Sequence, residues 1–322
     1  MSTTPPDLEL TEPVIPGPYT GVRFGRGDRV FSGVALASGV TILVTLAAVF
    51  VFLFVKGLPG FTADASIFAP SSSSFWTYVG RLLFGTILAA VIALVIAVPF
   101  SFALALFISH YAPRRIATTV AYVIDLLAAV PSVVFGLWGA RSLAVAFQPT
   151  QRWLDHNAGW LPFFKGPASA TGRTILVAGI VLAIMCIPII TAISREVFSQ
   201  TPRLHEEAAL ALGATRWEMV RYSVFPHARS GMVAAVMLGL GRALGETMAV
   251  AMVLSASPTI TLNLISSSNP ATIASNIASN YKAEDNRIQT VLLATGLVLF
   301  LFTFMVNFAA RYIAGRSERG QK

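Results

Sequence analysis

The chain has 322 residues, of which 55% are hydrophobic and 12% are charged, and its mean hydropathy is +0.71. This composition excludes an ordinary soluble domain and predicts an integral membrane protein, because a soluble fold has no place for several long apolar runs. The net charge of +8 would suggest nucleic acid as the partner of a soluble protein, but here it suits the basic loops of a membrane topology. The single cysteine, Cys186, excludes a disulfide within the chain.

The first predicted element is a polar, proline-rich segment, 1–29, which we expect to form a flexible cytoplasmic tail. Six apolar runs follow, and each exceeds the about 20 residues that a helix needs to cross a membrane. We therefore expect an all-α transmembrane domain at 30–312 and a cytoplasmic C-terminal tail at 313–322. The segment 71–76, before the second span, is a candidate interfacial helix. The six spans are placed at 30–55, 82–109, 116–140, 174–194, 231–255 and 288–312.

The distribution of lysine and arginine predicts the orientation of these spans. Basic residues are more frequent in the two tails and in connections 110–115 and 195–229 than in connections 56–81, 141–173 and 256–287. Because cytoplasmic loops carry an excess of basic residues, we expect both termini and the loop 195–229 in the cytoplasm. The other three connections are expected outside, where they could meet an extracytoplasmic partner.

The most polar internal stretch, 201–226, lies in that cytoplasmic loop and carries signals for two short helices. Thr201 is expected to cap the first helix, with Pro202 at its first position. Glu206 lies early in this helix, where the helix dipole favours negative charge. Gly213 is expected to end the helix, because glycine tolerates the left-handed conformation that follows many helices.

A capping box predicts the second helix. In this pattern the side chains of Thr215 and Glu218 each accept a hydrogen bond from the backbone N–H of the other residue. The helix is expected to end before Pro226. Two short helices joined at a glycine would make residues 201–226 a rigid knob at the membrane surface, a shape suited to docking another protein.

The spacing within this knob also resembles a known signature. The tripeptide EAA at 207–209 is followed after three residues by Gly213 and after nine more by SVFP at 223–226. This arrangement is similar to the EAA loop of bacterial ABC importer permeases, apart from Ser223 and Phe225, where that family usually has aliphatic residues. The resemblance implies coupling helices that dock in a groove of a cytoplasmic ATPase; the alternative is an ordinary amphipathic loop. The implied coupling residues are Glu206, Glu207, Ala208, Ala209, Gly213 and Pro226.

Arg242 lies near the centre of the fifth expected span, where translocon scales give about 2.5–3.5 kcal/mol for an arginine. This cost predicts that the side chain faces the protein interior and has a function. Glu246 follows one helical turn later, within ion-pair reach if the helix continues. Either the two charges neutralise each other and tie helices together, or Arg242 lines a path for an anion while Glu246 tunes its affinity. Gly241 and Gly245 are expected to let another helix approach closely.

Asp125 is the other acidic residue within an expected span. It could pair with Arg242 or with an arginine of a partner chain and so belong to the path, but a satisfied polar site explains it equally well. Pro99, Pro131 and Pro188 each interrupt a span and are expected to kink it.

Other sites are not indicated. The four histidines, His110, His156, His205 and His227, lack metal-ligand spacing and are expected to face solvent. The sequence contains no P-loop pattern, so ATP is expected on a different chain. Neither a Ser/His/Asp set nor a paired carboxylate is evident, so we expect a transport protein without catalytic residues, metal or cofactor.

Two further stretches narrow the resemblance. LLAAVPSVVFGLWG at 126–139 and GRALGETMA at 241–249, with the EAA-like loop, are similar to the PstC family of phosphate importer subunits over all but the tails. The resemblance implies a type I ABC importer permease in a bacterial plasma membrane, forming half of a phosphate path with Arg242 and Glu246 in it. The implied partners are a homologous PstA-like permease, two PstB-like ATPase subunits that bind ATP, and a PstS-like phosphate-binding protein.

Three alternatives remain at this stage. A sulfate or molybdate permease would share the fold and the loop. An ion-coupled secondary transporter would use Arg242 and Glu246 as its coupling site but leaves the glycine-jointed loop unexplained. A membrane scaffold without transport activity leaves the arginine in the span unexplained.

Overall fold

The structure, a computed structural model, describes residues 26–63, 74–282 and 285–319. Within these ranges every regular element is a helix and no strand occurs, which confirms the predicted all-α class. The expected tail before residue 26 and residues 71–73 and 320–322 lie outside the described residues. The α-helices are α1 (Arg26–Gly57), α2 (Phe75–Leu106), α3 (Arg114–Ala128), α4 (Ser132–Trp138), α5 (Ala144–Ala158), α6 (Ile175–Ser199), α7 (Arg203–Ala211), α8 (Arg216–Met219), α9 (Phe225–Gly245), α10 (Met248–Val253), α11 (Ile273–Asn280) and α12 (Asn286–Arg319). The shorter helices are the 3-10 helix η1 (Leu58–Thr62) and the π-helices η3 (Phe107–Tyr111), η4 (Gly139–Leu143) and η5 (Val220–Val224).

The chain divides into two compact units, Met1–Val49 and Phe50–Lys322. In the first unit the described residues belong to α1, whose apolar side chains, such as Phe31 and Leu43, are exposed. The second unit holds the hydrophobic core and all the other helices.

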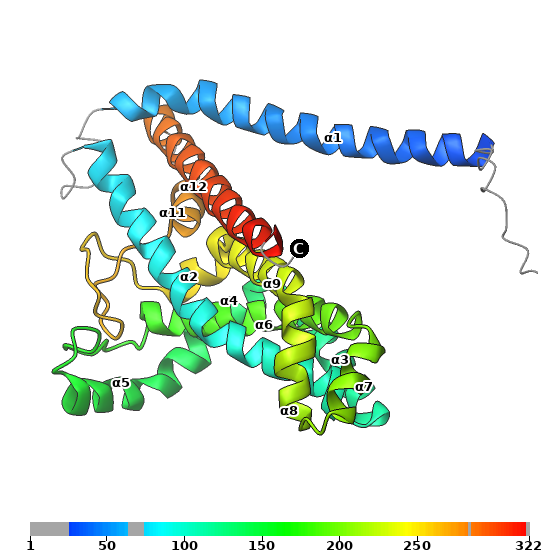
Figure 1. Ribbon diagram of the computed structural model, residues 1–322. Coiled ribbons are helices and arrows are strands. Elements are labelled where there is room, and N and C mark those ends of the chain that lie inside the picture. Colours follow the sequence, from blue (N-terminus) through cyan, green and yellow to red (C-terminus); the bar gives the residue numbers. More distant parts are fainter. Residues whose placement is uncertain (1–25, 64–73, 283–284, 320–322) are drawn as a thin grey trace, which may run out of the picture. The chain divides into compact units, whose positions relative to one another are not determined.

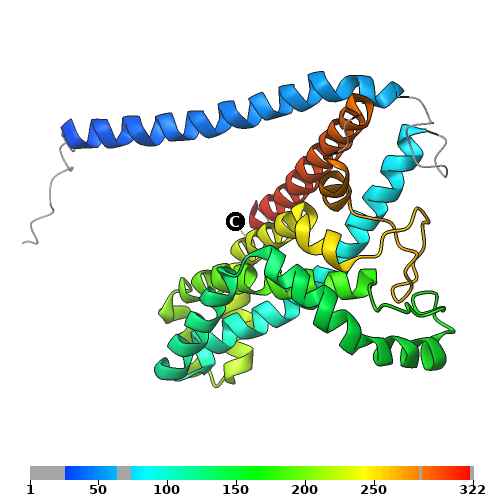
Figure 2. The same ribbon diagram turned by 180° about the vertical axis from the view of Figure 1, so that it is seen from behind.

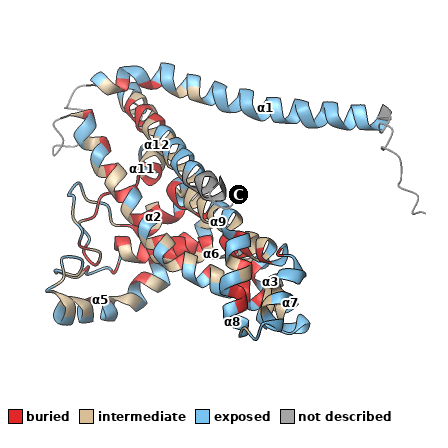
Figure 3. Cartoon of the chain, in the orientation of Figure 1, coloured by how far each residue is buried: buried red, intermediate tan, exposed pale blue. Residues whose placement is uncertain are grey.

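The core of the second unit is built by α2, α6 and α9, which pack against one another (Figures 1 and 2). Buried Ala89, Ala93 and Ala97 recur every four residues along α2, and such small side chains let a neighbouring helix approach closely. On α6, a Cβ added to Gly179 would lie 2.4 Å from a methyl carbon of Ile92. Buried residues accordingly gather on α6 and on the facing sides of its neighbours (Figure 3).

Helix α2 starts before residue 82, which was the expected start of the second span. Ser74 and Thr77 form a capping box, so the helix begins at Phe75. The ring of Phe75 is 2% exposed, and its centroid lies 4.9 Å from that of Phe61. The aromatic residues of segment 71–76 therefore form the first turn of α2 and not a separate interfacial helix.

Four described helical segments are long and apolar enough to cross a membrane, and a fifth span results if one bent pair is counted as a single span. This is fewer than the six expected spans. The segments are Gly27–Thr62, Phe75–Tyr111, Ile175–Ser199 and Asn286–Tyr312, with the bent pair Arg114–Ala128 and Ser132–Ala158. At the C-terminal end, α12 continues to Arg319, past the expected boundary at 312.

The expected span 116–140 is not one helix. It breaks between α3 and α4, and the helical segments on the two sides meet at 89°. Pro131 occupies the N-cap of α4, and proline disfavours helical dihedrals at the residue before it. The sequence predicted a kink at this proline, whereas the structure has a complete break.

The expected span 231–255 is also interrupted. Helix α9 begins earlier, at Phe225, and ends at Gly245, because Glu246 takes an extended conformation with ψ of 126°. The chain becomes helical again in α10. The connections expected at 141–173 and 256–287 are partly helical as well, since they contain α5 and α11.

Candidate translocation site and coupling surface

The two broken segments meet where α4 packs against α10. A Cβ added to Gly136 of α4 would lie 2.8 Å from the Cα of Ala249 in α10. Next to it, a Cβ added to Gly139 would lie 2.7 Å from a methyl carbon of Val181 and 2.9 Å from one of Val253. Only glycine permits the close backbone approach at Gly136, and Gly139, the first residue of η4, leaves room for the two valine side chains.

Arg242 lies in the last turn of α9, just before the helix ends. Its Nε atom is buried and has no hydrogen-bond partner among the described residues. An unpaired buried donor costs about 1–3 kcal/mol. Among the described residues, the Nε–H donor of this cationic side chain is therefore left without an acceptor.

The expected ion pair between Arg242 and Glu246 does not occur among the described residues. The reason is the end of α9 at Gly245, which removes the helical register that would bring the two side chains together. Glu246 instead accepts a hydrogen bond at its Oε1 atom from the backbone N–H of Ala249, at 3.1 Å. Its carboxylate thus satisfies one of the free N–H groups at the start of α10.

The expected close approach at Gly241 and Gly245 is absent as well. A Cβ added to either glycine would have no described atom within 4 Å. The glycine of α9 that does pack closely is Gly239, where an added Cβ would lie 2.6 Å from Ile190 of α6. Within the described chain, the face of α9 that carries Gly241 and Gly245 is left uncovered.

Asp125 lies on α3 and is exposed. It lines an open recess of about 340 Å³ with Arg195 of α6 and the hydroxyl residues Thr118 and Tyr122. Among the described residues it forms no ion pair with Arg242. The structure therefore places Asp125 beside a different arginine, Arg195.

The first helix of the knob (residues 201–226) is α7. Gly213 follows it with φ of +85°. The N–H of Ala214 donates to the carbonyl of Ala209 at 3.2 Å, and the N–H of Gly213 donates to that of Leu210 at 3.0 Å, which is the Schellman arrangement. The predicted glycine stop is confirmed. The predicted cap at Thr201 is wrong, because its hydroxyl is buried without a partner and α7 has no side-chain cap.

The second helix, α8, begins with the predicted capping box. The backbone N–H of Thr215 donates to Oε2 of Glu218 at 2.8 Å, and the backbone N–H of Glu218 donates to the Thr215 hydroxyl. The backbone N–H of Thr215, together with the Thr215 hydroxyl, which also donates to Oε2 at 2.8 Å, lowers the pKa of Glu218. The chain does not leave the helix at Pro226, since α8 passes through η5 into α9 and Pro226 fits in the first turn of α9.

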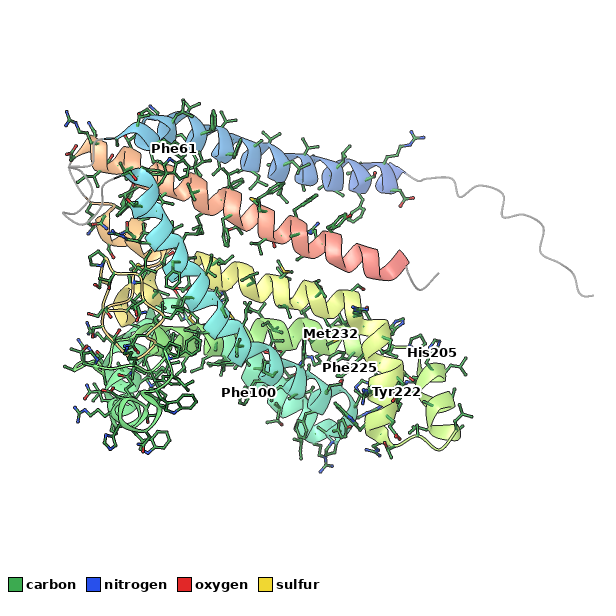
Figure 4. The ribbon with its side chains drawn as sticks, turned by 60° about the vertical axis from the view of Figure 1, so that its left-hand side comes forward. Phe61, Phe100, His205, Tyr222, Phe225 and Met232 are labelled. Carbon is green, nitrogen blue, oxygen red and sulfur yellow. The ribbon has the colours of Figure 1, made fainter. Side chains whose placement is uncertain are left out.

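The knob is attached to the membrane domain by a second, smaller cluster of buried apolar side chains. Phe225 and Met232, which pack against this cluster, are labelled in Figure 4. Helix α7 contributes no buried residue to this cluster. Its polar attachment is Glu206, whose Oε1 atom lies 3.5 Å from Nε2 of His110. The expectation that His110 faces solvent is therefore wrong. The cluster consists of Ala105, Leu106, Phe198, Met219, Val220, Val224 and Ala228.

Helix α7 presents apolar side chains to its surroundings. Leu204 is 74% exposed and Leu212 is 90% exposed. Glu207 is exposed beside them. Trp217 of α8 is 54% exposed, but its ring lies edge-on against that of Phe225, with 6.2 Å between the centroids, and so faces the membrane domain. Large apolar side chains gathered on one exposed face are typical of an interaction surface.

Sequence reasoning missed three of these contacts. His110 and Glu206 lie far apart in the sequence, and so do Ser223 and the backbone carbonyl of His205, to which the Ser223 hydroxyl donates at 3.3 Å. No local signal pairs such positions. The capping role of Glu246 did have a signal, since it lies three residues before Ala249, but an expected unbroken span concealed it.

Comparison with known proteins places the chain among transport proteins. Residues 97–319 match the family described as "Binding-protein-dependent transport system inner membrane component". A solved structure titled "Inward facing conformations of the MetNI methionine ABC transporter" is similar in fold, with a TM-score of 0.50 at 17% identity over 76% of this chain and 94% of that chain. This likeness confirms the predicted permease fold.

Several relatives are similar over nearly the whole length. The "Phosphate transport system permease protein PstC 2" of Mycobacterium tuberculosis is 47% identical over 306 residues, which cover 92% of this chain and 94% of that protein. The proteins named PstC of Mycobacterium leprae and Mesorhizobium japonicum are 44% and 35% identical, each over 92% of this chain. The chain therefore belongs to the inner membrane components of binding-protein-dependent transport systems and, among them, to the PstC permease family.

Proposed function

We propose that this chain is a transmembrane subunit of an ATP-driven importer of inorganic phosphate and forms half of the translocation path. The PstC relatives, which carry the name of phosphate transport permeases, support this proposal over nearly the full length. The observation that carries it is the buried Nε atom of Arg242, which has no partner among the described residues.

Arg242 provides the anion contact in this proposal. Its planar guanidinium presents several N–H donors in a geometry that suits two oxygens of one phosphate. A passing phosphate satisfies the donor that the protein leaves unpaired, and the donor is free again when the phosphate moves on. Glu246, at the helix break just after Arg242, adds a negative charge that keeps the anion from binding too tightly. Asp125 is proposed as a weaker contributor to the same path.

The knob couples the path to ATP hydrolysis. The exposed side chains of Leu204, Glu207 and Leu212 in the knob suit a groove on a cytoplasmic ATPase. Glu207, Ala208 and Ala209 supply the surface of this contact, and Gly213 and Pro226 fix its shape. ATP binds to the partner ATPase, so this chain itself is not an enzyme and needs no cofactor.

The complete importer is proposed to contain a PstA-like permease, two PstB-like ATPase subunits and a PstS-like phosphate-binding protein. The uncovered glycines of α9, Gly241 and Gly245, suit close packing by the second permease. The importer lies in a bacterial plasma membrane, with both ends of this chain in the cytoplasm.

The test is phosphate uptake by the whole co-expressed complex in cells that lack their own high-affinity system. Pull-down of the ATPase confirms that each variant assembles. We expect Arg242→Ala to assemble and to lose uptake, and Arg242→Lys to restore part of it, because lysine keeps the charge but not the planar fork. The matched control is Arg173→Ala, which removes an exposed arginine and should leave uptake unchanged.

Three outcomes would contradict parts of the proposal. Full uptake by the Arg242→Ala complex would make this arginine structural. Uptake of sulfate or molybdate but not of phosphate would change the cargo and keep the transport class. Uptake without any ATPase subunit would replace the importer by an ion-coupled transporter.

A further inference from the structure

Helix α7 is held on the membrane domain by few contacts. It has no fully buried side chain, and its apolar contact is the partly buried Ala209, which packs against the cluster that contains Phe198, Met219 and Val220. Two polar contacts tie its first turns to the rest of the chain. One joins Glu206 to His110, and the other joins the backbone carbonyl of His205 to the hydroxyl of Ser223. The position of α7 therefore depends on these contacts more than on burial.

The imidazole of His110 has a polar neighbour at each ring nitrogen. Its Nδ1 atom lies 2.6 Å from the hydroxyl oxygen of Ser109. Its Nε2 atom faces Oε1 of Glu206 at 3.5 Å. The two side chains thus form an imidazole–carboxylate contact between the end of α2 and α7.

This pair is shielded from solvent. The side chain of His110 is 9% exposed and that of Glu206 is 22% exposed. Partly buried charges are screened less by water and salt than surface charges are. The contact is thus more enclosed than the ordinary surface ion pairs that contribute little.

Both contacts to α7 come from π-helical turns. His110 belongs to η3, which ends α2, and Ser223 belongs to η5, which leads into α9. One extra residue in a turn rotates the side chains after it by about 100° relative to an unbroken α-helix. The π-turns therefore determine which side chains face α7, and such turns are frequent at functional sites.

We propose that the His110–Glu206 pair is a strut that transmits the movement of α7 to α2. Helix α2 packs along α6 and α9, and α9 carries Arg242. A displacement of the knob by an ATPase is passed through Glu206 and His110 to the end of α2 and from there to the path. His110 is a positioning residue in this scheme, since it acts through α2 and touches no phosphate. The inference rests on the proposed coupling of the knob to an ATPase.

The test measures the number of phosphates taken up for each ATP hydrolysed, using the complete importer in proteoliposomes. His110→Gln and Glu206→Gln keep the size of each side chain but remove the imidazole–carboxylate contact. We expect both to assemble and to hydrolyse ATP while the coupling ratio falls on the order of fivefold or more, the range of a typical coupling free energy between sites. The double variant His110→Glu with Glu206→His should restore much of the ratio. His156→Ala removes an exposed histidine of α5 and serves as the control.

Two results would contradict the strut. One is an unchanged number of phosphates per ATP in both single variants. The other is a swapped pair that loses as much of this ratio as the single variants do. Loss of the ATPase from the complex would show that the contact serves assembly and not transmission. If the unmodified complex moves another oxyanion and not phosphate, only the phosphate assignment is wrong. The number of anions taken up for each ATP hydrolysed can then be measured with that oxyanion, so the strut is still tested.

Discussion

The α4–α10 junction and the knob show two different ways of holding short helices in place. The junction has a close backbone contact: Gly136 on α4 meets Ala249 of α10 with no room for a side chain. The knob has local caps on α7 and α8, a small apolar cluster and two polar contacts. Close contacts make the junction rigid, whereas α7 depends on a few contacts with the segments that support it. This difference suits the proposed roles of the junction in the path and of the knob in coupling.

The largest effect is expected from a substitution at the α4–α10 junction. Gly136→Ala would place a Cβ 2.8 Å from the Cα of Ala249, so one backbone must shift. We expect the substitution to destabilise the protein by about 1–3 kcal/mol, as overpacking does in other cores. The measurement is the midpoint of thermal unfolding of the purified complex.

The control for this change is Gly80→Ala on α2. Gly80 is exposed, and an added Cβ would meet nothing within 4 Å. Alanine in an exposed helix stabilises by about 0.5–1 kcal/mol relative to glycine. Equal midpoints for the two variants would contradict the tight packing of α4 on α10.

A smaller effect is expected at Glu246, and it separates two roles of one side chain. Glu246→Ala removes the acceptor for the N–H of Ala249 and should cost about 0.5–2 kcal/mol, as the loss of a helix cap does. Glu246→Gln keeps an acceptor oxygen and removes the charge. We expect the glutamine variant to keep its unfolding midpoint and to lose phosphate uptake, because the proposed path uses the charge.

Normal uptake by the Glu246→Gln complex would leave capping as the role of this residue. A lowered midpoint of the glutamine variant would instead show that the cap itself needs the negative charge, as helix dipoles favour. Both quantities are measured on the same preparation, so stability and transport are separated directly.

The two regions also differ in how far the sequence predicted them. The stop at Gly213 and the box formed by Thr215 and Glu218 were predicted because each signal and its target lie within a few residues. The spans 116–140 and 231–255 were predicted as unbroken because apolar character continues through both breaks. Pro131 was visible in the sequence, but the close packing that accommodates a complete break, such as Gly136 against Ala249, is tertiary, and a single sequence does not display it.

The residues of the candidate site show the same difference between local signals and contacts of distant segments. Arg242 was found from its cost in an apolar span, which is a local property. Its lack of a partner among the described residues became visible only once α9 ended before Glu246. His110 was expected at the solvent because its partner, Glu206, lies on a distant segment of the chain. The sequence thus predicts the chemical groups at the site more reliably than their pairing.

The smallest expected effect concerns the capping box of α8 and depends on pH. Hydrogen bonds from the backbone N–H and the hydroxyl of Thr215 lower the pKa of Glu218. A carboxylate with a lowered folded-state pKa stabilises the fold above its unfolded pKa, and this contribution is lost as the pH falls through the lowered value. We expect the amide of Thr215 to stay protected from hydrogen exchange at neutral pH and to lose protection under acid conditions.

Glu218→Gln is the matched variant for this measurement. Its amide oxygen can still accept from the N–H of Thr215, but the side chain does not titrate, so protection should be weaker at neutral pH and independent of acid. A wild-type amide whose protection does not change with acid would show that the charge of Glu218 does not hold the start of α8. Because the box is exposed, its effect should stay within α8 and leave the α4–α10 junction unaltered, which separates the locally capped region from the tightly packed one.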